Sequence, residues 1–322
     1  MTKTVFSLSL LLLLAFSAAC FPLEEAPALL SGAPSTPGRD AFFVAFYAGD
    51  YDALDEIIEL LTREYLDGDD ISTATLGFAH AWRLAESSRN SEGPARVIES
   101  ADLAVRFFEE SSEVFPNDAR LRGFLGSFKQ ASGSIHGHDD LKTEGWFDQQ
   151  GAAQDWPEWG YFTQAYGLVT LEPSETRYND GIELYWKNID ACIDGSIDRN
   201  NFDYLPYVED VQNDSDERDS RACGNSEVVP FNTQGFFLIF GDMLAKGNQL
   251  EDAEKMYQTA LDIPSDEAWP YRELTENRLE TLSDLPNAFA KDVERGSEVN
   301  PYKTTIFSGP MNCVACHEGA AL

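Results

Sequence analysis

The sequence predicts an all-α protein built mainly as an array of helical hairpins. Apolar residues recur at the spacing of one helix face, as Leu54, Ile57, Ile58 and Leu61 do. Gly, Pro, Asn and Asp residues separate such stretches at short intervals, and we find no convincing alternation of apolar and polar residues that would indicate strands. Helices of moderate length joined by short turns are typical of arrays in which each hairpin packs on its neighbours.

The same pattern predicts where the individual helices lie. After the first amphipathic stretch we expect helices at Thr73–Ser87, Ala95–Phe115, Asp118–Gln130, Pro157–Val169, Glu175–Ile189, Thr233–Lys246, Leu250–Leu261 and Ala268–Ser283. The middle of the chain, from about 132 to 232, departs from the repeating pattern. Its large aromatic residues are expected either to fill an irregular core or to line a ligand pocket: Trp146, Trp156, Trp159, Tyr161, Tyr166, Tyr185 and Trp186.

One predicted hairpin, Gln234–Pro264, has a specific pattern of small and large residues. Gly241 and Ala253 would let two helices approach closely, and Tyr257 would fill the adjoining groove. This unit resembles a tetratricopeptide repeat, although Leu244 stands where that repeat usually has Tyr. The resemblance implies an α-solenoid with a concave surface for a partner or ligand, and it does not imply an enzyme.

The N-terminal segment has the features of an export signal. Lys3 precedes an apolar run, Val5–Phe16, that is too short to span a bilayer comfortably. Small residues then lead to Cys20, and this arrangement resembles the lipobox of bacterial lipoproteins. The resemblance implies that residues 1–19 are removed, that Cys20 is acylated, and that the protein lies on the periplasmic side of the outer membrane; ordinary signal cleavage is the alternative.

The remaining chain divides by composition into three parts. Residues 20–38 are rich in Pro, Ala, Ser and Gly and predict a flexible linker behind the lipid anchor. Residues 39–300 form the predicted helical-repeat domain, and residues 301–322 form a short tail.

The tail carries the motif Cys313-Val314-Ala315-Cys316-His317. Two thiols at this spacing reach one edge of a porphyrin, and the following imidazole can ligate its iron. The segment resembles the attachment site of c-type cytochromes. That resemblance implies one covalent haem c on Cys313 and Cys316, with His317 as the proximal ligand.

The tail also differs from a small cytochrome. The given sequence ends at Leu322, without the further residues that would supply a Met ligand, so we expect the haem to pack against the preceding helices. His136 and His138, in a Gly- and Ser-flanked segment, are the first candidates for a distal ligand, and His80 is another. A partner could also supply that ligand, or the position could be empty.

The other cysteines allow further alternatives. Cys192 and Cys223 are expected to form a disulfide in an oxidising compartment, or else to be two unpaired buried cysteines. Cys313, Cys316 and His317 could bind zinc with His136 or His138, as a rival to haem. Acidic stretches at 194–203 and 210–219 lack the Gly and terminal Glu of an EF-hand, so calcium is not expected.

Charge narrows the class of partner. Lys and Arg number 23 against 56 Asp and Glu, which gives a formal net charge of −33. This balance argues against nucleic acid and against electrostatic binding to anionic lipid, so we expect membrane contact through the lipid anchor only. It suits a solvated acidic surface or a basic redox protein as partner.

We expect a mono-haem protein that transfers single electrons or docks a redox partner in the periplasm. The alternative is a scaffold or ligand-binding lipoprotein of the kind that serves transporters, without redox activity. A haem enzyme such as a peroxidase is less favoured, because no distal acid or base residues are arranged for one.

Overall fold

The computed structural model describes residues 36–86, 93–169, 171–214, 217–226, 229–265, 268–290 and 314–317. The predicted signal peptide, Cys20, Cys313 and nearly all of the predicted linker lie outside these ranges. The described residues are helical with no named strand; Ser226 and Val229 form one isolated bridge. The expected all-α class is therefore confirmed for this part of the chain.

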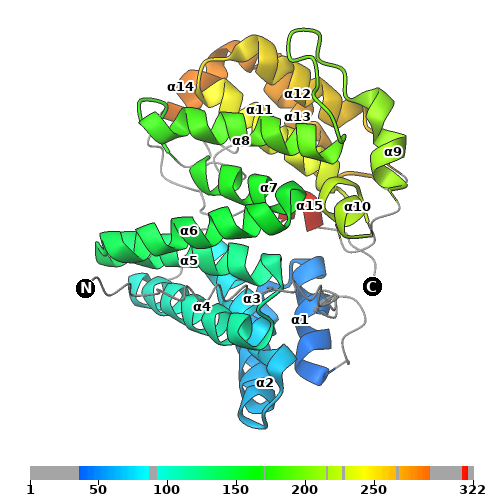
Figure 1. The fold of residues 1–322 in the computed structure, drawn as a ribbon. Coiled ribbons are helices and arrows are strands. Elements are labelled where there is room, and N and C mark those ends of the chain that lie inside the picture. Colours follow the sequence, from blue (N-terminus) through cyan, green and yellow to red (C-terminus); the bar gives the residue numbers. More distant parts are fainter. Residues whose placement is uncertain are drawn as a thin grey trace, which may run out of the picture.

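Helices α4 to α7 are joined by connections of one to four residues, whereas residues 193–207 separate α8 from α9 (Figure 1). Their bounds are α1 Pro37–Ala48, α2 Leu54–Leu66, α3 Asp70–Glu86, α4 Pro94–Val114, α5 Ala119–His136, α6 Asp139–Asp155, α7 Pro157–Leu168, α8 Thr176–Cys192, α9 Val208–Gln212, α10 Glu217–Cys223, α11 Asn232–Lys246, α12 Leu250–Asp262, α13 Arg272–Glu280, α14 Leu285–Ala290 and α15 Val314–His317.

Consecutive helices pack against each other from α1 to α8, and again from α11 to α13. Their buried side chains form three apolar clusters. One joins α1, α2, α3 and α4, a second joins α3, α4 and α5, and the largest extends from α7 to α14. The described body therefore has an N-terminal half, α1–α6, and a C-terminal half, α7–α14, which occupy the lower and upper parts of Figure 1.

The first helix begins within the predicted linker. α1 starts at Pro37, two residues before the expected boundary at Arg39. Proline suits the first turn because its missing N–H would have no intrahelical partner there. The Thr36 hydroxyl caps the helix by accepting a hydrogen bond from Arg39 N, and the Glu64 carboxylate of α2 accepts one from Gly38 N at 2.7 Å. These contacts tie the helix start to α2.

The middle of the chain contains a helix that the apolar pattern did not predict. α6 buries Gly145, Gln149, Ala152 and Ala153 and leaves Phe147 exposed, so it has no apolar stripe. Several middle aromatics fill the C-terminal core, which supports the first of the two expected roles. Those buried there are Tyr166, Tyr185 and Trp186.

Candidate functional site

The motif turn α15 lies where the two halves of the body meet (Figure 1). It carries Cys316 and His317, two of the three chemically active motif residues. It packs against α11 of the C-terminal half, while the His317 ring contacts α1 of the N-terminal half. The motif is therefore part of the packed body at these two residues.

Cys316 lies against the start of α11. Its side chain is buried, its carbonyl accepts a hydrogen bond from Phe231 N at 3.2 Å, and its Sγ lies 3.9 Å from the carbonyl oxygen of Asn232. Burial raises the pKa of the Cys316 thiol to about 12, because an apolar surrounding disfavours the thiolate. The docked cysteine is therefore a protonated thiol at neutral pH.

His317 lies against two aromatic rings of α1. The ring centroids of Phe46 and Tyr47 are 5.1 and 6.1 Å from that of the imidazole, and the Tyr47 ring is stacked on it at 22°. Burial raises the pKa of Tyr47 to about 12, against the opposing charges of Arg221 in α10 and Arg39 in α1. A neutral aromatic surface thus faces the motif histidine.

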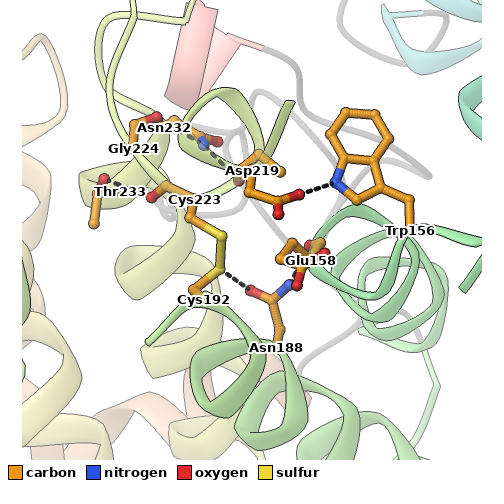
Figure 2. Close-up of a disulfide and its surroundings, with 10 residues drawn as sticks. Trp156, Glu158, Asn188, Cys192, Asp219, Cys223, Gly224, Asn232 and Thr233 are labelled. Carbon is orange, nitrogen blue, oxygen red and sulfur yellow. Dashed lines mark hydrogen bonds between the residues drawn. A yellow bond between two sulfur atoms is a disulfide. The ribbon is translucent and has the colours of Figure 1, made fainter. Parts of the chain in front are cut away.

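A disulfide lies behind the α11 side of this site. Cys192 in α8 and Cys223 in α10 are bonded, with Cα atoms 5.6 Å apart (Figure 2). The Thr233 hydroxyl donates to Cys223 O at 3.1 Å, and the Asn232 amide donates to Gly224 O at 3.1 Å. The start of α11 is thereby held on the end of α10.

A tryptophan joins the same region to α6 and α7. Trp156, between these two helices, donates from Nε1 to an Asp219 carboxylate oxygen of α10 at 3.0 Å (Figure 2). Asn188 of α8 donates to the backbone carbonyl of Glu158 in α7. The short helix α10 is therefore held by the disulfide to α8 and by Trp156, and α8 is itself joined to α7.

The candidate distal histidines make local contacts elsewhere. His136 Nε2 lies 3.0 Å from a carboxylate oxygen of Asp102, and its ring stacks on that of His138 at 5.6 Å. His136 is the last residue of α5, and His138 is the N-cap of α6, whose 17 residues extend about 25 Å to the Trp156 end. None of these contacts involves α15.

His80 is buried in α3 and stacks on Phe107 with ring centroids 5.7 Å apart. Burial, and to a lesser degree the charge of Arg83, lowers its pKa to about 4. Its Nδ1 has no hydrogen-bond partner among the described residues. The ring is therefore neutral and packed against α4.

The zinc alternative has no support in the described residues. No group of three or more His, Cys, Asp and Glu side chains in those ranges could hold a metal ion. Among the described residues, His136 and His138 do not join Cys316 and His317 in such a group, and Cys313, the remaining residue of the zinc alternative, lies outside the described ranges.

The residues that hold the motif turn were not predicted from the sequence. Phe46 and Tyr47 belong to an aromatic run on α1 that signals a buried face, but nothing local connects them with a tail some 270 residues later. Phe231 and Asn232 carry no signal that would have found them.

No protein-family model, curated protein or solved structure matches this chain. In the described ranges, no helix combines the length and the apolar character needed to cross a membrane.

Proposed function

We propose that this chain is an exported, lipid-anchored mono-haem c-type protein that transfers single electrons or docks a redox partner. The observation that carries the proposal is the placement of Cys316 and His317 on one helical turn within the packed body. Cys313 and Cys316 would hold the haem, and His317 would be its proximal ligand. When bound, the haem would supply a one-electron centre through its iron.

The described residues suit this group chemically. A thiol and an imidazole are adjacent on α15, and aromatic side chains of α1 provide the apolar contact that a porphyrin favours. Cys313 and Cys316 would hold the haem through thioether bonds, each formed by adding the thiol sulfur and hydrogen across a vinyl double bond, so that no group would leave. Because docked Cys316 is buried, we infer that its thiol reacts while the tail is away from the body.

We expect no histidine of this chain to fill the distal position without rearrangement. His136 is paired with Asp102, His138 stacks on His136, and His80 stacks on Phe107. His317 would then be the histidine of this chain that holds the iron, and any further ligand would come from a partner.

The body would act as an α-solenoid that shields the haem and presents a surface to a partner. Sequential packing of helices supports this arrangement, as does the hairpin α11–α12, in which the Tyr257 ring lies against Gly241. The N-terminal sequence supports export and acylation at Cys20, with the protein at the periplasmic side of the outer membrane. A basic redox protein is the partner that suits the net charge of −33.

Expression of the full chain with a haem-maturation system tests the proposal. The product should keep its haem absorbance after denaturation and acid-acetone extraction, because thioether bonds survive both. The matched control is Cys313→Ala with Cys316→Ala, which should lose all covalent haem. A colourless product from the unmodified chain would contradict the proposal, and the spectrum of a coloured one would report the distal ligand.

A second candidate function is a helical-repeat scaffold or ligand-binding lipoprotein without redox activity. The burial of Cys316 favours this second function, because the role of α15 would then be to complete the packed body. The same double variant separates the two functions. If it binds its periplasmic partner as well as the unmodified chain does, haem is not needed for that role.

A further inference from the structure

The two described motif residues are held by opposite halves of the protein. Cys316 lies against α11 of the C-terminal half, and His317 lies against α1 of the N-terminal half. The helices α1 and α11 belong to different apolar clusters. A single helical turn therefore bridges the beginning and the end of the helical body.

We propose that Phe46, Tyr47 and Asn232 form a two-sided dock that positions the motif turn, with the aromatic pair orienting the His317 imidazole. This inference rests on the proposed function for its consequence at the haem. The dock itself concerns only residues of this chain and can be tested without haem.

The α11 side of the dock is rigid because it is anchored on α10. The Asn232 amide donates to Ala222 O at 2.8 Å and to Gly224 O at 3.1 Å, on either side of the disulfide-bonded Cys223. The neighbouring Phe231 N–H holds the Cys316 carbonyl at 3.2 Å. The cysteine end of the turn is thus fixed to the C-terminal half by backbone contacts.

The α1 side is rigid because its rings are themselves packed. Phe46 meets Trp82 of α3 edge-on at 5.4 Å and stacks on Phe42 at 5.6 Å, and Tyr47 stacks on Phe43 at 5.7 Å. Aromatic rings held in this way leave the imidazole few orientations. The histidine end of the turn is thus fixed to the N-terminal half by side-chain contacts.

This division has a consequence for the proposed iron site. A change in how the two halves lie against each other would turn the imidazole relative to Cys316. The proximal ligand influences the reduction potential and the spectrum of a haem. Both quantities would therefore change with the relative position of the two halves.

The reactivity of Cys316 measures docking directly. The full chain is prepared with acylated Cys20 and without haem maturation, and Cys313→Ala leaves Cys316 as its one reactive thiol beside the intact disulfide. A maleimide should label Cys316 slowly in the folded protein, because the thiol is buried. Phe46→Ala and Tyr47→Ala should each raise the labelling rate about tenfold, the factor expected for loss of a packed aromatic contact.

The matched control is Tyr65→Ala, which removes a tyrosine of α2 that packs on Phe107 in the same half. It should leave the labelling rate within about twofold, because none of the ring contacts between described residues joins Tyr65 to the turn Val314–His317. Tyr47→Phe keeps the ring and should label like the parent. Equal rates for Phe46→Ala, Tyr47→Ala and Tyr65→Ala would overturn the dock.

The haem-loaded protein supplies a second readout. Phe46→Ala should shift the midpoint potential and the visible spectrum, whereas Tyr65→Ala should change neither. Haem that is retained with unaltered potential and spectrum in Phe46→Ala would overturn the positioning role and leave the proposed function standing. If the chain takes up no haem, the proposed function fails, and the labelling rates still decide whether the dock exists.

Discussion

Two buried ionisable groups, one in each half of the body, are accommodated in opposite ways. In the C-terminal half, Asp242 and Arg278 form a fully buried ion pair at 2.9 Å, and the Tyr257 hydroxyl donates to the same carboxylate at 2.6 Å. In the N-terminal half, buried His80 is neutral and packed on Phe107. The buried Asp242 carboxylate is stabilised by the positive charge of Arg278. Buried His80 is stable in its neutral form, so protonation of its imidazole would destabilise the fold.

Two closely packed helix pairs, one from each half, differ in a similar way. In α11–α12 the space left by Gly241 is taken by the Tyr257 ring. In α5–α6, Gly126 and Gly145 bring one helix backbone onto the other, so a Cβ at Gly145 would meet the carbonyl of Gly126. A side chain can shift to relieve crowding and a helix backbone cannot, so the α5–α6 pair should tolerate less change.

The largest effect is expected for Arg278→Met in the C-terminal half. The substitution leaves the buried Asp242 carboxylate without its counter-charge, which typically costs about 3–5 kcal/mol in the free energy of unfolding. Burial already raises the pKa of Asp242, so the carboxyl would take up a proton more readily in the variant. Urea unfolding at neutral pH measures the loss.

The control for this prediction is Arg272→Met, which removes the exposed partner of Glu276 and should cost less than about 1 kcal/mol. Adding Asp242→Asn to Arg278→Met should recover part of the loss, since no charge is then buried. A loss for Arg278→Met no greater than that of Arg272→Met would show that the pair does not stabilise this half.

The next largest effect is a loss of unfolding free energy at acid pH that arises from His80 in the N-terminal half. The unfolded chain binds a proton at this site near pH 6.5, whereas the folded chain does so only near pH 4. The stability contributed by neutral His80 is therefore complete above pH 6.5 and is lost as the pH falls toward 4, by up to about 3 kcal/mol.

Unfolding free energies at pH 7 and pH 4.5 test this in the parent and in His80→Gln. Carboxyl groups titrate over the same pH range in both proteins. The difference between the two proteins in the change of unfolding free energy with pH therefore isolates the contribution of His80. The parent should lose more. Parallel pH profiles would mean that His80 is protonated in the folded state or is not buried.

The smallest of the three effects is expected for Gly145→Ala, at about 1–3 kcal/mol of lost stability from overpacking against α5. The control is Gly167→Ala in α7, where an added Cβ meets nothing within 4 Å. That variant should be neutral or stabilised by up to about 1 kcal/mol, because Ala lowers the entropy of the unfolded chain. Equal losses from both substitutions would show that the close approach of α5 to α6 is not what makes Gly145 sensitive to an added methyl group.

Sequence patterns located the regular helices better than the irregular ones. The expected Thr233–Lys246 and Leu250–Leu261 correspond to α11 and α12 within one residue at each end, because their apolar faces are continuous. The helix α6 escaped prediction because its buried face consists of Gly145, Gln149 and Ala152. Close backbone approach and amide hydrogen bonds, such as that from Gln130 to Gln149 at 2.6 Å, replace the apolar stripe.

The sequence by itself determined the helical class and the motif Cys313–His317, because helix periodicity and motif spacing are local properties of the chain. It also made Cys192 and Cys223 candidates for the bond that joins α8 to α10. Only the tertiary structure decided that Cys316 meets Asn232 and that His317 meets Phe46 and Tyr47. Those contacts join segments far apart in the chain, and they depend on how all the intervening helices pack rather than on any pattern near the motif.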